Sequence, residues 1–239
     1  MIEFTTVEFD HEGTALVGQA AIPEGSGPFP AVLVMHNALG IGPHVRDVAL
    51  RLAALGYVAV ATDMYGGGAE AGSPLASGAG YEAVMKDPAL LRRRVAAWFE
   101  QVARPDNVLA DRVAAIGFCF GGTCVLELAR SGAPARAVVS YHGILTTAQP
   151  MQAGAYTGEV HAYCGARDPY APLEHIEGLR AELAAAEANH TIITFGEAAH
   201  GFTDPGADAL RREGIAYNAL ADRVSWAGTV ALLEAVLKD

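Results

Sequence analysis

The chain has 239 residues, of which 51% are hydrophobic and 18% are charged. Disordered chains are poor in hydrophobic residues, so this composition predicts a folded protein, and its length suits one large domain. Sixteen Lys and Arg residues against 27 Asp and Glu residues give a formal net charge of −11. Nucleic acids and anionic membrane surfaces are bound by clustered positive charge, so the charge balance argues against both as partners.

The cellular compartment is predicted from the first residues and from the cysteines. Residues 1–9 alternate like a strand and lack the basic and apolar regions of an export signal. The apolar runs are far shorter than the roughly 20 residues that a membrane span needs. Three cysteines, Cys119, Cys124 and Cys164, are an odd number, which makes a disulfide framework improbable. We therefore expect a reduced, cytoplasmic protein.

Secondary structure is predicted in chain order from hydrophobic periodicity. Residues 2–10 and 15–22 predict two strands that form an antiparallel hairpin at the edge of a sheet. Beyond them, short apolar runs that predict buried strands alternate with longer runs at helical spacing. The predicted strands are 31–36, 57–62, 112–117, 136–141, 160–164 and 191–195. The predicted helices are 45–55, closed by Gly56, and 81–102, 123–131, 172–188 and 217–238.

This alternation predicts an α/β fold, with a mostly parallel, twisted sheet flanked by helices. No linker or change of composition divides the chain, so residues 1–239 are expected to form a single domain. Sheets of this kind bind ligands beyond the carboxyl ends of their strands. Side chains that directly follow the predicted strands are therefore the first candidates for chemistry.

The first candidate is Cys119, in the segment Gly117-Phe118-Cys119-Phe120-Gly121. The segment has the pattern Gly-x-nucleophile-x-Gly between a predicted strand and a predicted helix. This turn is so tight that the two flanking glycine positions leave little room for side chains, and it exposes the nucleophile on a strained backbone. The start of a helix also favours a thiolate. The alternative for the pentapeptide alone is a buried cysteine in a glycine-rich turn.

Two further candidates follow later strands in the chain. Asp168 comes after the strand 160–164, and His200 comes after the strand 191–195. Nucleophile, acid and histidine in this chain order are typical of α/β-hydrolases. In such a triad His200 takes the proton of Cys119 and later protonates the leaving group, while Asp168 fixes the imidazole tautomer. Singly, an Asp before Pro is more often a turn residue and a lone His more often structural.

Two backbone amides complete the predicted site as an oxyanion hole. One is the N–H of Phe120, directly after the nucleophile. The other is expected in the loop after the strand 31–36, and we assign it to the N–H of Ala38. Each such donor is worth roughly 3 kcal/mol in the reaction barrier.

Together these residues resemble the dienelactone hydrolase family, over essentially the whole chain. The resemblance implies the α/β-hydrolase fold without a lid domain. It also implies a carboxylic ester hydrolase that acts on small esters or lactones, with no metal or organic cofactor. We expect a monomer or weak homodimer. The matching segments are His36-Asn37-Ala38-Leu39-Gly40, Asp63-Met64-Tyr65, Gly117-Phe118-Cys119-Phe120-Gly121-Gly122, Gly165-Ala166-Arg167-Asp168-Pro169 and His200-Gly201-Phe202.

Two positions depart from the family pattern. Family members that act on dienelactone carry Glu in place of Asn37, and that Glu keeps the resting thiol neutral until substrate displaces it. They also carry an Arg in place of Asp204, and that Arg grips the substrate carboxylate. At 4 Å and an effective dielectric near 20, one unit charge is worth roughly 4 kcal/mol, so Asp204 should repel an anionic substrate. We therefore expect a substrate other than dienelactone, and a resting thiolate–imidazolium pair of Cys119 and His200.

The remaining candidates are residues expected to line the substrate pocket. Tyr65, His142 and Phe202 each follow a strand or adjoin a triad residue, and they join Asn37 and Asp204 in this set. For His142, a structural histidine is an equally open interpretation. The run 92–94 of three arginines lies on a predicted helix, where a solvated face is expected. No Cys-x-x-Cys or His-Glu-x-x-His pattern predicts a metal site.

The sequence leaves three functions open. The leading hypothesis is a hydrolase of a small ester or lactone that forms a covalent acyl-cysteine on Cys119; acyl transfer uses the same parts. The second is a hydrolase-like small-molecule binding or sensing module with little turnover. The third, a redox thiol protein, lacks a resolving cysteine placed beside Cys119.

Overall fold

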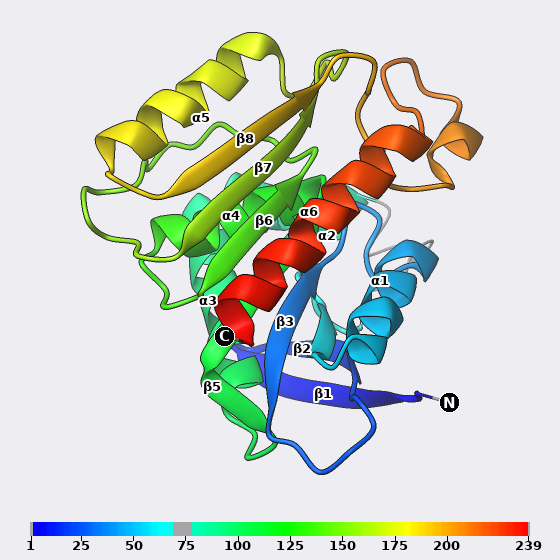
Figure 1. The fold of residues 1–239 in the computed structure, drawn as a ribbon, viewed down its shortest axis with the longest axis vertical. Helices are drawn as coiled ribbons and strands as arrows, with labels where there is room; N and C mark the ends of the chain where they lie inside the picture. The colour runs from blue at the N-terminus through cyan, green and yellow to red at the C-terminus, as the bar shows by residue number, and fades with distance from the viewer. Residues whose placement is uncertain (1, 69–77, 239) are drawn as a thin grey trace.

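The computed structural model describes residues 2–68 and 78–238, and these form one eight-stranded sheet (Figure 1). The strand order is β1-β2-β4-β3-β5-β6-β7-β8. The first two strands pair antiparallel as an edge hairpin, β2 pairs antiparallel with β4, and every later pairing is parallel. This confirms the predicted mostly parallel sheet with an antiparallel hairpin at its edge. The strands are β1 (Phe4–His11), β2 (Thr14–Ala21), β3 (Phe29–Met35), β4 (Val58–Thr62), β5 (Val108–Phe118), β6 (Ala137–Tyr141), β7 (Glu159–Gly165) and β8 (His190–Phe195).

Helices cover both faces of the sheet and divide the core into two. Side chains of α1 and α6 pack in one core, on the face turned toward the viewer in Figure 1, and those of α2 to α5 pack in the other. None of the helices in the described residues is long and apolar enough to cross a bilayer. The helices are α1 (Pro43–Ala54), α2 (Gly80–Lys86), α3 (Pro88–Ala103), α4 (Phe120–Arg130), α5 (Leu173–Ala185) and α6 (Ala219–Leu237), with a short 3₁₀ helix, η2 (Ala207–Leu210).

The central strands explain why the sequence reads as continuous apolar runs. On β3, Val32 and Val34 face the core with α1 and α6, while Leu33 and Met35 face the opposite core. Strands that are buried on both faces need apolar side chains at every position rather than at alternate ones. The carboxyl ends of these parallel strands lie at one edge of the sheet, where the predicted site residues follow.

Several predicted boundaries differ from the structure. The helix predicted at 81–102 is two helices, because Asp87 ends α2 and caps α3 by accepting from the N–H of Leu90 at 2.9 Å, with Pro88 in the first turn. Strand β5 begins at Val108, four residues before the predicted start. The last helix begins two residues late, because the side chain of Asn218 caps it.

The expectation of a solvated face for the three arginines is wrong at two of them. Arg94 is buried and donates to the carbonyl of Met64 at 2.9 Å. Arg92 forms an ion pair with Glu127, on α4. Glu127 also pairs with Arg130 at 2.9 Å, and Arg130 pairs with Glu182 of α5 at 2.7 Å. These last four side chains form an ion cluster that ties three helices together on one face of the sheet.

Candidate active site

The predicted nucleophile elbow is the turn between β5 and α4. Cys119 lies there with φ 55° and ψ −115°, a conformation that is strained for a residue with a side chain. A Cβ atom on Gly117 would overlap the backbone of Gly121, and one on Gly121 would overlap the carbonyl group of Met35. Both glycines are therefore required by close backbone contacts, which is the reason that the pattern has glycine at these two places.

Two more predicted residues meet Cys119 at this edge of the sheet. Asp168 follows β7 and His200 follows β8, and Nδ1 of His200 lies 2.8 Å from Oδ2 of Asp168. The other oxygen of Asp168 accepts from the N–H of Tyr170 at 2.8 Å, which fixes the carboxylate. The side chain of Cys119 lies close enough to His200 to act on the protonation of its ring. Three residues that are far apart in the sequence thus come together at one edge of the sheet, with a hydrogen bond between Asp168 and His200.

The surroundings of His200 favour a protonated imidazole. The side chain of His200 is 7% exposed and that of Asp168 is fully buried. Burial alone would lower the pKa of His200, but the hydrogen bonds and negative charges of Asp168 and Cys119 outweigh it and raise that pKa to about 10. At neutral pH the ring therefore carries the proton.

The loop between β3 and α1 adjoins the elbow. The position of a Cβ on Gly121 would also meet the carbonyl oxygen of His36, so this loop starts directly against the first turn of α4. Asn37 shapes the loop: its Oδ1 accepts from the N–H of Leu39 at 2.9 Å and its carbonyl accepts from Gly40 at 3.2 Å. Ala38 is half-buried in this loop, and Phe120 is the first residue of α4, where the helix itself supplies no acceptor for an N–H.

The predicted pocket residues lie at different depths. Tyr65 is buried, packs against the ring of Phe120 at 5.5 Å and donates its hydroxyl to the carbonyl of Ala38 at 3.0 Å. Burial raises the pKa of Tyr65, so this phenol stays neutral. Phe202 is fully buried and packs against His142 in the core behind the site.

The other two predicted pocket residues, His142 and Asp204, are occupied by contacts within the protein. His142 is 2% exposed, and both of its ring nitrogens have partners in the protein. Asp204 is half-buried, and its Oδ1 accepts from the N–H of Gly206 at 2.8 Å. Its charge also acts on His44 at the start of α1: burial lowers the pKa of His44, and the carboxylate of Asp204 partly offsets this.

Sequence reasoning missed two aromatic side chains beside the site. The ring of Tyr170 lies 4.7 Å from that of His200 and is 42% exposed, so it forms part of the open rim. Tyr81, on α2, packs edge-on against Phe120 at 5.5 Å. Burial and the negative charge of Cys119 raise the pKa of Tyr81. The position of Tyr170, two residues after Asp168 in the predicted loop, was a usable signal; the helix position of Tyr81 gave none.

The other two cysteines are in the core. Cys124 and Cys164 are buried and unpaired, and burial raises the pKa of both thiols, that of Cys164 to about 12. Neither is suited to act as a nucleophile at neutral pH. Within 2–68 and 78–238, no group of three or more His, Cys, Asp or Glu side chains is arranged to hold a metal ion.

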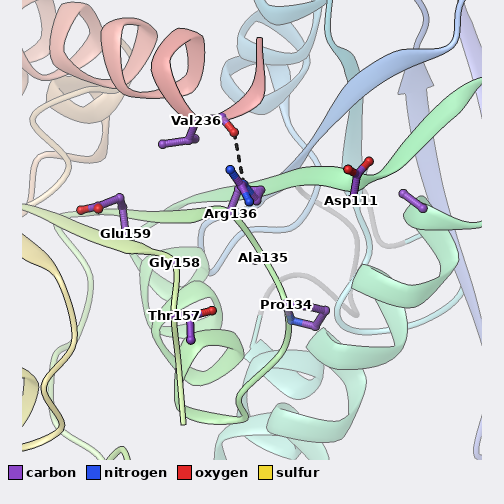
Figure 2. Close-up of a pocket in the computed structure, with 9 residues that line it drawn as sticks. Asp111, Pro134, Ala135, Arg136, Thr157, Gly158, Glu159 and Val236 are labelled. Carbon is purple, nitrogen blue, oxygen red and sulfur yellow. Dashed lines mark hydrogen bonds between the residues drawn. The ribbon is translucent and has the colours of Figure 1, made fainter. Parts of the chain in front are cut away.

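A surface hollow of about 620 Å³ lies at a different place, at the amino ends of β5, β6 and β7 (Figure 2). Arg136 is one of the residues that line it and donates to the carbonyl of Val236 at 3.3 Å. Parallel sheets bind ligands at the opposite ends of their strands. The candidate active site is therefore at Cys119 and not in this hollow.

Comparisons with known proteins identify the family. The family model described as "Dienelactone hydrolase family" matches residues 16–237. A putative carboxymethylenebutenolidase of Synechocystis sp. (strain ATCC 27184 / PCC 6803 / Kazusa) is 28% identical, with 99% of this chain and 98% of the relative covered. The structure named m3DLH is 36% identical, with a TM-score of 0.92 over 99% of each chain. A dienelactone hydrolase-like promiscuous phosphotriesterase, P91, from metagenomic libraries is 34% identical, with a TM-score of 0.90 over 98% of each chain.

These matches extend over nearly the whole chain, and the fold is that of the α/β-hydrolases. The expected family is thereby confirmed, together with its general activity on lactones or esters. The chain belongs to the dienelactone hydrolase family of hydrolases.

Proposed function

We propose that the chain hydrolyses a small ester or lactone through a Cys119–His200–Asp168 triad and an acyl-cysteine intermediate. The observation that carries the proposal is the hydrogen bond between Asp168 and His200 at 2.8 Å, beside Cys119 at a strained strand–helix turn. A nucleophile, a base within hydrogen-bond reach and a third group that orients the base are the parts that acyl transfer needs.

The acylation step starts from a thiolate. We infer that the imidazole holds the proton and that the sulfur carries the negative charge, because the carboxylate of Asp168 at 2.8 Å favours the imidazolium. The thiolate of Cys119 attacks the carbonyl carbon and forms a C–S bond, and the carbonyl oxygen becomes an oxyanion. When this intermediate collapses, the C–O bond to the leaving group breaks, and His200 gives its proton to the departing oxygen.

The charge of Cys119 also controls when His200 releases that proton. The thiolate is one of the two groups that raise the pKa of His200, and its charge is consumed as the C–S bond forms. The imidazolium therefore becomes a stronger acid at the moment when the leaving group needs a proton. The neutral imidazole then accepts a proton from water, which attacks the thioester, and the C–S bond breaks to restore the thiolate–imidazolium pair.

The amides of Phe120 and Ala38 are proposed to bind the oxyanion. The support is positional: Phe120 begins α4, and the loop that carries Ala38 lies against the first turn of that helix. The carbonyl of Asn37, which shares a peptide group with the N–H of Ala38, accepts from the N–H of Gly40 at 3.2 Å, and this hydrogen bond fixes the orientation of that peptide plane. Donors that are fixed before the reaction cost no reorganisation when the charge develops.

The substrate is proposed to be an ester or lactone other than dienelactone. Asn37 is neutral and its side chain is engaged in the turn with Leu39, so no carboxylate at this position opposes the resting thiolate. Asp204 stands where the family has a cation for the substrate carboxylate, and its negative charge disfavours anionic substrates. Uncharged short-chain esters and lactones fit both departures.

Hydrolysis of p-nitrophenyl acetate, combined with mass spectrometry of the protein, tests the proposal. Wild type should release p-nitrophenol and carry an acetyl group on Cys119 when it is quenched early. Cys119→Ala should lose both signals, whereas Cys124→Ala, a matched control that removes a buried thiol five residues away, should keep them. Turnover that persists in Cys119→Ala would refute the triad. Binding of esters by wild type without turnover would instead support a binding or sensing module.

A second candidate is hydrolysis of neutral phosphotriesters. The observation that favours it is the likeness in fold and sequence to the promiscuous phosphotriesterase, over 98% of both chains. A thiolate beside an imidazolium can attack phosphorus and expel a phenolate, as it does at a carbonyl carbon. Paraoxon hydrolysis by wild type, lost in Cys119→Ala, would support this activity as a side reaction of the same site.

A further inference from the structure

His142 lies between the elbow and the loop that carries His200. It follows β6 with φ 39°, and its backbone N–H donates to the carbonyl of Tyr163 at 2.8 Å. The backbone N–H of Cys119 lies 3.1 Å from its ring atom Nδ1. Its other ring nitrogen, Nε2, lies 2.8 Å from Oγ1 of Thr203, three residues after His200. One buried ring therefore contacts both segments that bring the reacting groups together.

These two contacts determine the tautomer of His142. A backbone N–H can only donate, so Nδ1 must accept and carries no hydrogen. The single ring hydrogen is therefore on Nε2, which donates to the hydroxyl of Thr203. A doubly protonated ring would set an N–H against the N–H of Cys119 and break the contact with the elbow.

The surroundings of His142 keep the ring neutral. Burial lowers its pKa well below the ordinary value, and the positive charges of His200 and His44 lower it further. Of these two, His200 comes from the loop after β8, 5.3 Å away between ring centres, and His44 from the start of α1. The other faces of the ring meet Phe118 and Phe202, which carry no charge.

The contact with Cys119 acts on the strained residue itself. The same N–H of Cys119 also donates to the carbonyl of Tyr141 at 3.0 Å, so two acceptors from the end of β6 hold the backbone of the nucleophile. Thr203 belongs to the turn that begins at His200. A shift of either segment would stretch one of the two hydrogen bonds of His142.

We propose that His142 is a positioning residue: its neutral ring fastens the elbow to the His200 loop and so keeps Cys119 and His200 aligned for proton transfer. This inference rests on the proposed triad. It also assigns a role to Thr203, whose hydroxyl is the outer anchor of the ring. His142 does not contact the substrate in this arrangement, because both of its nitrogens are used within the protein.

The test compares Thr203→Val with Thr203→Ser. Valine keeps the shape but removes the acceptor, whereas serine restores the hydroxyl. For p-nitrophenyl acetate, Thr203→Val should lower kcat about 10-fold to 100-fold with KM within about 3-fold, because alignment acts on the transition state more than on binding. Thr203→Ser should recover most of the lost rate. His142→Asn, whose Oδ1 can take the place of Nδ1 at Cys119, should be faster than His142→Phe, which removes both contacts.

A second readout does not depend on turnover. The rate of alkylation of Cys119 by iodoacetamide, measured from pH 5 to pH 9, reports how well His200 holds the thiolate. Thr203→Val should alkylate more slowly than wild type at pH 6, and Thr203→Ser should follow the wild-type profile.

The inference is overturned if Thr203→Val and Thr203→Ser have equal kcat values and equal alkylation profiles, since the hydroxyl then has no role. If His142→Phe does not fold, the Thr203 pair still decides. If Cys119→Ala retains esterase activity, the triad is refuted, while the alkylation profiles still show whether the Thr203 hydroxyl acts on Cys119.

Discussion

Asp168→Asn is the substitution that tests most directly how Asp168 keeps the ring of His200 protonated. Asn keeps the size of the side chain and its contact with the N–H of Tyr170, but it removes the negative charge beside His200. An amide can also turn its N–H toward Nδ1, which would move the ring hydrogen to Nε2. An imidazole with hydrogen on Nε2 cannot accept the proton of Cys119.

The size of the effect follows from the pKa of His200. Burial opposes the imidazolium, and the net increase from the ordinary 6.5 to about 10 corresponds to about 5 kcal/mol in its favour, which Asp168 and Cys119 supply together. Loss of about half of this costs 2 to 3 kcal/mol, or about 100-fold in rate. The wrong tautomer adds to this, and in serine triads the same exchange costs about 10⁴-fold. The expected loss in kcat/KM at pH 7 is therefore between about 10² and 10⁴.

Two measurements check this prediction. The first is kcat/KM for p-nitrophenyl acetate at pH 7 in wild type and Asp168→Asn, with circular dichroism to confirm folding. The second is an NMR titration of the His200 ring, which should change protonation near pH 10 in wild type and at lower pH in the variant. A loss in kcat/KM of less than about 5-fold, or an unchanged titration of His200, would refute the reasoning.

Three further predictions concern the elbow, the pocket and the ion cluster. Gly121→Ala should destabilise the fold by at least about 3 kcal/mol in thermal unfolding, because its Cβ meets backbone, whereas Gly178→Ala, in open space on α5, should stabilise it by about 0.5 to 1 kcal/mol. Asp204→Arg should raise kcat/KM for an anionic lactone more than for a neutral ester, and equal effects would contradict the charge argument. Burial raises the pKa of Glu182, but the ion pair with Arg130 outweighs this effect and lowers that pKa overall. The ion pair therefore stabilises the fold fully above pH 4.5, and this stabilisation is lost as the pH falls through the pKa of Glu182 in the folded protein. Glu182→Gln should cost about 2 kcal/mol in denaturant unfolding at pH 7 and flatten this acid dependence; an unchanged curve would show that the pair contributes nothing.

The sequence was sufficient to predict the parts of the fold that depend on local pattern. The alternation of buried strands and amphipathic helices led to the parallel sheet, because strands such as β3 are apolar at every position. The break between α2 and α3 was also signalled, by Asp87 and Pro88, but a continuous hydrophobic period concealed it. The early start of β5 had no such signal, since Val108 pairs with Phe29 of β3 and the register then shifts before Val113 pairs with Ala31.

In the candidate site, too, some residues could be predicted from a local pattern and others could not. Cys119 was predictable because a tight turn demands glycine around it, and its chain order with Asp168 and His200 follows from the topology. The role of His142 was not predictable, because it depends on Thr203, which approaches it from a loop 61 residues away. Such a contact is decided by packing in three dimensions, and no local pattern records it.

The close backbone contacts around Gly117 and Gly121 have a consequence for protein engineering. The location of the side chain at position 119 is set by the main chain, and this side chain is half-buried at the margin of the larger core. Sulfur, oxygen or selenium can therefore be exchanged at this corner without redesign of its architecture. The reaction rates of variants that differ only in the nucleophilic atom at position 119 can then be compared within the same surroundings.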